Sequence, residues 1–298
     1  MRLIATLIAN PDSRALDARL ADAARDALDG SGGRVGAVDW LAAETACDIP
    51  FDDIAPADAH AGLQAALGAA PVDIVAQRRD GRRKHLLIAD MDATIVVGET
   101  LDELAAHAGL KDRIAAITAR AMRGEIDFPG ALRERVAMLK DLPVSALHDT
   151  LRETRLMPGA RQLVRTMRAH GAYTVLVSGG FRFFTDEIAT RVGFHANQAN
   201  DLLIQNGRLT GGVAEPILDR DAKLAALKRI ALEQDLPVSD SLAVGDGAND
   251  LPMIRAAGLG VAFHAKPMVE AEAPVAIRHG DLTALLYIQG YRAEEFED

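Results

Sequence analysis

A short apolar run that ends in two aspartates constrains the fold of this chain more than any other feature. The run Leu86-Leu87-Ile88-Ala89 leads directly into Asp90-Met91-Asp92-Ala93-Thr94. A continuous apolar run of this length is typical of a strand buried on both faces, as in a parallel sheet. In open α/β sheets, ligands bind at the carboxyl ends of such strands. Two acids one residue apart project to the same side of an extended chain and repel each other. A bound divalent cation, a covalent reaction or both would compensate that repulsion.

The first 80 residues predict a small α+β domain of the ferredoxin-like kind, because strands and helices follow one another in the order βαββαβ. The expected strands cover 3–9, 34–40, 45–51 and 72–77, and the expected helices cover 13–29 and 56–67. Five of the seven residues from Arg78 to Lys84 are basic. We interpret this segment as a solvated linker, and contact with nucleic acid is the alternative.

Residues 85–298 predict a doubly wound parallel sheet, since apolar runs alternate with helical segments. Its expected strands cover 86–89, 173–177, 241–244, 259–262 and 275–277. Residues of about 100–155 are rich in Ala, Leu, Arg and Glu and show no strand pattern. The fold class is therefore α/β, with a helical cap inserted after the first strand and a small α+β domain in front. Such an insert would cover the carboxyl end of that strand as a lid.

Composition limits the partners that this chain can have. The formal net charge is −10, and an acidic protein lacks the basic face that nucleic acid or an anionic membrane requires. No apolar run reaches the roughly 18 residues of a membrane-spanning helix, and the apolar stretch at 3–9 is too short for a signal peptide. The single cysteine, Cys47, cannot form an internal disulfide, and a buried thiol suits a reducing compartment. A cytoplasmic protein that binds neither nucleic acid nor membrane is expected.

Four polar clusters follow strands or open helices in the second region. They are Asp90-Met91-Asp92-Ala93-Thr94, Ser178-Gly179-Gly180, Asp221-Ala222-Lys223 and Gly245-Asp246-Gly247-Ala248-Asn249-Asp250. Because the carboxyl ends of parallel strands meet at one edge of the sheet, all four are expected to gather there.

These residue types suit phosphoryl transfer. Asp90, nearest the strand, can act as the nucleophile and form an aspartyl-phosphate. Asp92 can protonate the leaving oxygen and later deprotonate water, provided that its pKa is raised. Lys223 supplies a compensating positive charge. The Ser178 hydroxyl and the glycine backbone at 179–180 can bind the phosphate, because glycine lets a ligand approach the main chain closely.

The same edge is expected to hold Mg²⁺, which prefers a few carboxylates together with waters and a phosphate oxygen. The candidate ligands are Asp90, Asp92, Asp246, Asp250 and the Met91 carbonyl, with Asn249 in a supporting, substrate-binding place. Each cluster alone also fits a plain turn, a capped helix or a calcium loop. The twelve-residue EF-hand spacing with its terminal Glu is missing, however, and four clusters in this order favour a catalytic site.

Taken in order, the four clusters resemble those of the haloacid dehalogenase-type phosphohydrolases, over about residues 85–290. The insert adds Glu99, nine residues after Asp90, together with the runs Ala-Met-Arg-Gly-Glu-Ile-Asp-Phe at 121–128 and Leu-Arg-Glu-Arg-Val at 132–136. The Met-Pro-Gly-Ala run at 157–160 is also present. Ala93 departs from the serine common at that position, and no chemistry depends on its side chain.

The resemblance implies a magnesium-dependent phosphatase that releases phosphate from O-phospho-L-serine, a small-molecule substrate, in the last step of L-serine biosynthesis. It implies that Glu99 and Arg135 clamp the amino and carboxylate groups of that substrate, and that Met122 and Phe128 shield the site. The pairing is sensible, since an acid suits an ammonium group and an arginine fork suits a carboxylate. The alternatives are a phosphatase or phosphotransferase for another small phosphomonoester, such as phosphohomoserine, and an amino-acid-sensing regulatory protein.

Residues 1–80 resemble the degenerate ACT-like region found ahead of some bacterial members of this family. The resemblance implies a role in packing or in forming a homodimer, and effector binding is the alternative. No clear ligand loop is visible in this part of the sequence.

Overall fold

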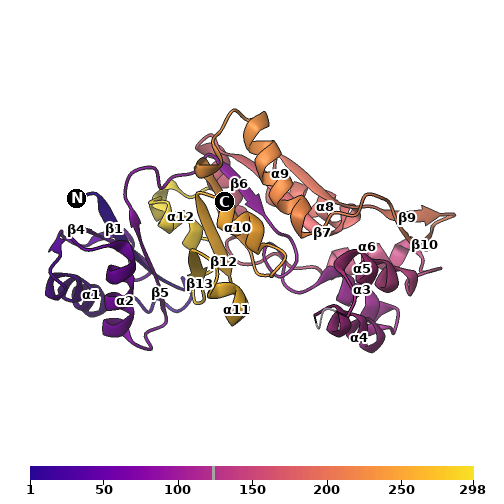
Figure 1. Ribbon diagram of the computed structural model, residues 1–298, viewed down its shortest axis with the longest axis horizontal. Helices are drawn as coiled ribbons and strands as arrows, with labels where there is room; N and C mark the ends of the chain where they lie inside the picture. The colour runs from indigo at the N-terminus through magenta and orange to yellow at the C-terminus, as the bar shows by residue number, and fades with distance from the viewer. Residues whose placement is uncertain (123–124) are drawn as a thin grey trace.

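Two β-sheets of different kinds organise the chain, and a helical cap lies at the far end from the N-terminus (Figure 1). The computed structural model describes residues 1–122 and 125–298, and the side chains of Met122 and Arg220 are outside this description. Within these ranges, no helix combines the length and the apolar character needed to cross a membrane.

The N-terminal sheet is antiparallel and has the strand order expected of a ferredoxin-like domain. Its strands are β1 (Leu3–Ala9), β2 (Arg34–Val35), β3 (Asp39–Ala42), β4 (Ala46–Asp52) and β5 (Val72–Arg78), in the order β2-β4-β1-β5, with β3 also paired to β4. Helices α1 (Ala18–Gly30) and α2 (Pro56–Leu67) pack on it. Leu28 and Leu63 of the helices meet Ile49 and Phe51 of β4 in one buried cluster.

Two expected boundaries in this part were wrong. Helix α1 begins at Ala18 instead of residue 13, because the Asn10 carbonyl accepts hydrogen bonds from the N–H groups of Ser13 and Arg14 in a preceding turn. Asp17 then caps the helix, since its side chain accepts from the N–H of Leu20 at 2.9 Å. The single strand expected at 34–40 is broken into β2 and β3 by residues 36–38.

The second sheet is parallel and has β6 near its centre. The strands are β6 (Leu86–Ala89), β7 (Tyr173–Phe181), β8 (Ala196–Asn200), β11 (Ser241–Gly245), β12 (Leu259–Phe263) and β13 (Val275–Ile277), in the order β13-β12-β11-β6-β7-β8. From β6 the chain builds outward to β8 and then returns to β11 on the other side of β6. This reversal is the point of a doubly wound sheet where ligands bind.

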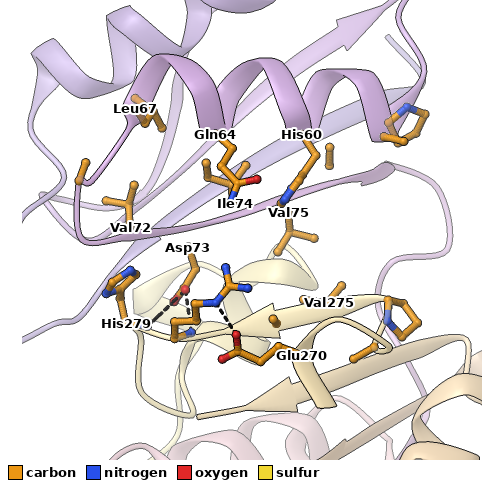
Figure 2. A pocket seen from close by; sticks show the side chains of 18 of the residues that line it. His60, Gln64, Leu67, Val72, Asp73, Ile74, Val75, Glu270, Val275 and His279 are labelled. Carbon is orange, nitrogen blue, oxygen red and sulfur yellow. Dashed lines mark hydrogen bonds and ion pairs between the residues drawn. The ribbon is translucent and has the colours of Figure 1, made fainter. Parts of the chain in front are cut away.

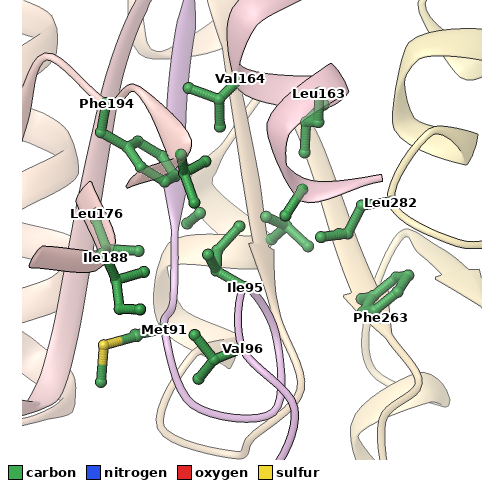
Figure 3. Close-up of a cluster of buried hydrophobic side chains, with 14 of the residues drawn as sticks. Met91, Ile95, Val96, Leu163, Val164, Leu176, Ile188, Phe194, Phe263 and Leu282 are labelled. Carbon is green, nitrogen blue, oxygen red and sulfur yellow. The ribbon is translucent and has the colours of Figure 1, made fainter. Parts of the chain in front are cut away.

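Helices cover both faces of the parallel sheet, so its strands alternate between two buried cores. Leu87, Leu176 and Val244 face one core with helices α7 (Ala160–Ala169), α8 (Arg182–Val192) and α12 (Ala284–Ile288). Figure 3 shows part of that core, where Ile188 of α8 lies near Leu176 and Met91. Ile88 and Val175 face the other core with α9 (Arg220–Glu233) and α10 (Leu251–Ala256). The short elements η1 (Val238–Asp240), α11 (Pro267–Glu270) and η2 (Ala293–Glu295) complete this part.

The cap consists of α3 (Thr100–His107), α4 (Lys111–Met122), α5 (Phe128–Ala137) and α6 (Val144–Glu153). Two antiparallel segments join it to the parallel sheet, with a β-bridge between Val96 and Leu156. A hairpin of β9 (Leu202–Gln205) and β10 (Arg208–Val213) lies against the cap, and the N–H of Leu209 donates to the Leu142 carbonyl. The sequence patterns predicted neither this hairpin nor β8.

The second half of the segment between the two sheets, residues 82–84, is anchored, so the prediction of a solvated linker was wrong there, while residues 78–81 are exposed as expected. Arg82 is 14% exposed in its side chain and ion-pairs with the buried Asp48 at 2.6 Å. The Arg83 guanidinium lies over the ring of Tyr291 and ion-pairs with Glu295 at 2.7 Å. Arg82, Arg83 and Lys84 thus make contacts within the protein, whereas Arg78 and Arg79 are exposed.

A second joint connects the sheets at β5. The buried carboxylate of Asp73 accepts hydrogen bonds from three successive backbone N–H groups, at 2.8 Å from Arg278, 3.1 Å from His279 and 2.7 Å from Gly280. Beside it, a cavity of about 590 Å³ separates α2 and β5 from residues 270–279, and Figure 2 shows His60 and Gln64 on its α2 side. None of the four polar clusters lines this cavity.

Candidate active site

The first cluster sits at the carboxyl end of β6, held by a tight turn. The N–H of Asp90 donates to the Val244 carbonyl of the neighbouring β11 at 3.0 Å, which continues the sheet to the edge. The chain then turns back at Ala93, whose φ is +53°, and the Ala93 N–H donates to the Gly98 carbonyl. Both aspartates therefore lie at the sheet edge where the cap segment begins.

Lys223 links the third cluster to the first and the fourth. Its Nζ lies 2.7 Å from Asp90 Oδ1 and 2.6 Å from Asp250 Oδ1, and its side chain is 1% exposed. Burial alone would lower the pKa of Lys223, but Asp250 and Asp90 outweigh this and raise it, so the ammonium form is favoured. Burial and the charge of Asp250 raise the pKa of Asp90 well above its usual value, against the effect of Lys223.

The fourth cluster supplies two more carboxylates. Asp250 Oδ2 accepts from the Gly247 N–H at 3.0 Å, and Asp246 Oδ1 accepts from the Thr94 hydroxyl at 3.3 Å. Burial and the nearby Asp250 raise the pKa of Asp246 to about 6. A Cβ on Gly245 would meet the Asp250 carboxylate, so the close approach of this turn requires glycine.

Asp90, Asp246 and Asp250 can each offer one oxygen to a shared ion, with these atoms all within 4.8 Å of one another. When all three are ionised, Lys223 balances one charge and two negative charges remain. That surplus, made of hard oxygen ligands, fits a divalent cation such as Mg²⁺.

Two of the expected ligands do not join this group. The side chain of Asp92 is not among the three carboxylates. The Met91 carbonyl accepts hydrogen bonds from the N–H groups of Thr94, Ile95 and Val96, so it serves the turn and not an ion. The prediction of the Met91 carbonyl as a ligand was wrong. The Asp92 carbonyl accepts no hydrogen bond from the described residues, and it is the backbone oxygen that this turn leaves available.

Asp92 lies between the cap segment and the second cluster. Its Oδ1 accepts from the Thr100 N–H at 3.0 Å, at the first residue of α3. Burial raises the pKa of Asp92, and the hydrogen bond from Thr100 opposes this. A Cβ on Gly180 would lie 3.0 Å from Asp92 Oδ2, so the two clusters approach each other closely at this glycine. A carboxyl group with a raised pKa can hold a proton for a leaving group.

The second cluster forms the last part of β7, where the pairing with β8 shifts register between Val177 and Phe181. Ser178 is 1% exposed, and its Oγ accepts from the Gly180 N–H at 2.9 Å. An ideal Cβ on Gly179 would lie 3.1 Å from the Phe128 ring of α5. The cap therefore touches the end of β7 at this point, and the aromatic ring lies over the glycine.

Glu99 and Arg135 come to the site from different cap helices. Glu99 precedes α3 and keeps accessible surface, yet surrounding protein atoms displace much of its hydration. This desolvation, reinforced by Asp92 and Asp246, raises the pKa of Glu99 to about 8. Burial lowers the pKa of Arg135 on α5, and the charges of Asp102 and Glu99 oppose this. Within the described residues the two form no ion pair with each other, so both can receive a ligand's charged groups.

The structure thus brings most of the predicted site residues to one edge. Asn249 is half-buried beside Gly247 in the same turn. Met122 ends α4, but its side chain lies outside the described residues. Sequence reasoning did not single out Asp102 of α3, whose charge acts on both Glu99 and Arg135. Its position three residues after Glu99, the N-cap of α3, was an available signal. It also missed Asn200, whose partners are distant in the sequence.

Comparison with known proteins identifies the family. The model of the haloacid dehalogenase-like hydrolases matches residues 87–255, more than half of the chain. The chain belongs to this family. The phosphatases of this family generally use a divalent metal, and the group of three carboxylates at the sheet edge is consistent with that.

Several relatives are phosphoserine phosphatases. The enzyme of Streptomyces coelicolor is 45% identical over 233 residues, which cover 78% of this chain and 57% of that protein. The enzyme of Streptococcus thermophilus is 45% identical over 205 residues, which cover 69% of this chain and 95% of that protein. A solved structure of a probable phosphoserine phosphatase from Vibrio cholerae, in unliganded form, matches with a TM-score of 0.80 at 31% identity and covers 99% of this chain and 88% of that one. The chain spans little more than half the length of the Streptomyces relative.

Proposed function

We propose that this family member is a magnesium-dependent phosphatase that hydrolyses O-phospho-L-serine to L-serine and phosphate, the last step of L-serine biosynthesis. One observation carries the proposal: an acid and an arginine, Glu99 and Arg135, flank the edge that holds Asp90, and neither forms an ion pair with a described residue. A phosphate ester that carries both an ammonium and a carboxylate satisfies these two charges. The names of the relatives support the same substrate.

In the first step, an Asp90 carboxylate oxygen attacks phosphorus, and the bond between phosphorus and the seryl oxygen breaks. Asp92 gives its proton to that oxygen, so serine leaves as a neutral alcohol. The raised pKa of Asp92 supports this role, because the carboxyl group must begin protonated. The product on the protein is an aspartyl-phosphate.

In the second step, the Asp92 carboxylate takes a proton from water, whose oxygen attacks phosphorus. The bond between phosphorus and Asp90 breaks, which releases phosphate and restores both aspartates. Lys223 holds Asp90 in place through the 2.7 Å contact and offsets negative charge in both steps. The Ser178 hydroxyl and the backbone at 179–180 hold the phosphoryl oxygens.

Asp90, Asp246 and the Asp92 carbonyl would hold Mg²⁺, with Asp250 in support through Lys223 and the Gly247 N–H. When bound, the cation neutralises charge on the phosphoryl group and orients it.

Three further assignments belong to this proposal. Residues 1–80 and 85–298 form separate domains, with the cap at about 100–155, and the N-terminal domain supports a homodimer. The buried single thiol of Cys47 supports a cytoplasmic location. Phe128, whose ring contacts Gly179, shields the site together with Met122.

Phosphate release tests the proposal. O-phospho-L-serine, phosphothreonine, phosphohomoserine and p-nitrophenyl phosphate are compared with magnesium and then with excess chelator. The expected result is magnesium-dependent turnover with a strong preference for phosphoserine. Turnover of the aryl ester without that preference would keep the chemistry and reject the substrate. No turnover of any ester would reject the phosphatase and favour an amino-acid-binding regulatory protein.

A further inference from the structure

Asn200, at the end of β8, is a buried polar residue that none of the proposed catalytic steps uses. The residue is 3% exposed, and its side-chain amide forms hydrogen bonds to two separate segments, at Gly179 and at Leu218. Nδ2 donates to the Gly179 carbonyl at 2.8 Å, and Oδ1 accepts from the Leu218 N–H at 2.7 Å. Nδ2 also lies 3.5 Å from the Leu218 carbonyl, a weaker contact.

The bond to Gly179 fixes the orientation of residues 178–180 at the end of β7, the phosphate loop of the proposed mechanism. In a trans peptide the carbonyl and the following N–H point in opposite directions. When Asn200 holds the Gly179 carbonyl, the Gly180 N–H turns to the other side, where it donates to Ser178 Oγ at 2.9 Å. The described residues offer the Ser178 hydroxyl proton no acceptor, so that proton is available to a phosphoryl oxygen.

The bond to Leu218 fixes the start of α9. Leu218 precedes Asp219, the N-cap of this helix, whose side chain accepts from the N–H groups of Asp221 and Ala222. Lys223 follows within the first helical turn and reaches Asp90 and Asp250. A displacement of Leu218 would therefore move the ammonium group away from the nucleophile.

We propose that Asn200 is a positioning residue, whose single planar amide locks the phosphate loop to the helix that carries Lys223. The role needs a donor and an acceptor on one short side chain, which aspartate and alanine do not provide at neutral pH. This inference rests on the proposed phosphatase function.

The test compares Asn200→Ala and Asn200→Asp with a matched control, Asn197→Ala. Asn197 lies on the same strand and also makes two side-chain bonds, donating to Asp186 at 2.9 Å and accepting from Thr185 at 2.7 Å, away from the four clusters. For each protein, kcat and KM are measured with phosphoserine and with p-nitrophenyl phosphate. The inhibition constant of inorganic phosphate and the Tm are measured as well.

Both Asn200 variants are expected to lower kcat for both substrates by about 10- to 100-fold and to raise the phosphate inhibition constant by roughly tenfold, because preorganised donors act on the phosphoryl group. Asn197→Ala is expected to stay within about twofold of the wild type in both quantities, whatever its Tm. Loss of folded protein lowers the apparent kcat but leaves the phosphate inhibition constant unchanged. The inhibition constant therefore distinguishes unfolding from a loss of positioning.

A wild-type phosphate inhibition constant in a folded Asn200 variant would overturn the inference, and so would the same change in Asn197→Ala. If Asn200→Ala does not fold, Asn200→Asp carries the same test, since its carboxylate still accepts from the Leu218 N–H. A wild-type protein without turnover of any ester would instead reject the proposed function.

Discussion

At the scale of single residues, charge balance around Lys223 decides what the site can bind. Two carboxylates, Asp90 and Asp250, contact the Lys223 ammonium group. The third, Asp246, lies close to both, and burial and Asp250 raise its pKa to about 6. The surplus of negative charge is costly in a folded protein without a cation. A divalent ion removes that cost, so the metal is expected to stabilise the fold as well as to serve the chemistry.

Metal removal should therefore make stability depend on pH. Because the folded-state pKa of Asp246 is raised, and those of Asp90 and Asp92 are raised as well, these groups favour folding below their usual pKa of 3.8. Their contribution is lost as pH rises through the folded values, to about 6 for Asp246. With chelator, Tm is expected to fall between about pH 5 and about pH 7.5, and excess Mg²⁺ should restore it.

The control is Asp246→Asn, which removes one titrating carboxylate and one ligand. Its Tm should change less with pH in chelator and respond less to Mg²⁺ than that of the wild type. An equal magnesium response in both proteins would remove Asp246 from the ion site.

Glu99 predicts a pH dependence of substrate recognition. Its pKa of about 8 means that the ligand-free carboxyl is largely neutral at pH 7, and ionisation above pH 8 strengthens its attraction for an ammonium group. The ratio of KM for phosphoserine to KM for p-nitrophenyl phosphate should fall as pH rises from about 6.5 to 8.5. Dividing by the KM of the aryl ester removes the effect of protein groups whose titration changes both KM values equally.

Glu99→Gln should abolish that pH dependence, and Arg135→Ala should raise the same ratio by about tenfold or more at every pH, since it removes a charge-assisted pair. A ratio that is constant with pH in the wild type, or one unchanged in Arg135→Ala, would contradict the clamp.

Most of the catalytic and metal-binding residues that sequence reasoning found lie at or directly after the end of a strand or near a helix start, whereas Arg135, inside α5, was expected only from the family resemblance. Asp90, Ser178 and Asp246 could be placed because a parallel sheet brings its strand ends together. Asn200 could not, because its role comes from bonds to residues 21 and 18 positions away, across elements that were not predicted. The Met91 carbonyl was misjudged because the hydrogen bonds of one tight turn are not visible in a pattern of residue types.

At the scale of elements, the join between cap and sheet depends on the segment before α7. Gly159 has φ +79°, and an ideal Cβ there would lie 2.7 Å from the Thr283 nitrogen. The N–H of Leu282 donates to the Pro158 carbonyl at 3.1 Å in the same contact. The segment that returns from the cap to α7, which is the second side of the cap hinge, thus packs closely against the residues before α12.

Gly159→Ala should destabilise the protein more than Gly171→Ala, a matched control with φ +85° and no atom within 4 Å of the added Cβ. The control measures the left-handed conformation alone, about 1–2 kcal/mol. Gly159→Ala should exceed it by at least about 1 kcal/mol, because backbone must also move. Equal unfolding free energies in denaturant titrations would show that the contact at Thr283 does not constrain the hinge.

Element prediction succeeded where burial leaves a strong pattern and failed where polar residues form strands. The apolar runs of β6, β11 and β12 are buried on both faces and were predicted within one residue of their ends. β8 has the sequence Ala-Asn-Gln-Ala-Asn, and the β9–β10 hairpin keeps Leu203 and Ile204 exposed, so neither shows the expected periodicity. Pairing with β7 stabilises β8, and hydrogen bonds with the cap stabilise the β9–β10 hairpin.

At the scale of the whole molecule, Asp73 is the principal polar contact between the two sheets near the cavity. Asp73→Ala would leave three backbone N–H groups without their acceptor, at a cost of roughly 3 kcal/mol. Hydrogen exchange at residues 278–280 should accelerate in this variant. Asp22→Ala, on the exposed face of α1, should leave it unchanged. Unchanged exchange in Asp73→Ala would show that the sheets are held by other contacts.

In the proposed mechanism, Asp90 attacks the phosphorus of O-phospho-L-serine. The most direct measurement is rapid acid quenching of the magnesium-loaded protein with ³²P-labelled O-phospho-L-serine, followed by peptide mapping. If an aspartyl-phosphate forms on Asp90, the peptide that contains Asp90 carries a transient, hydroxylamine-sensitive label, and Asp90→Asn carries none. Turnover without a labelled protein, or a label on another peptide, would contradict this mechanism.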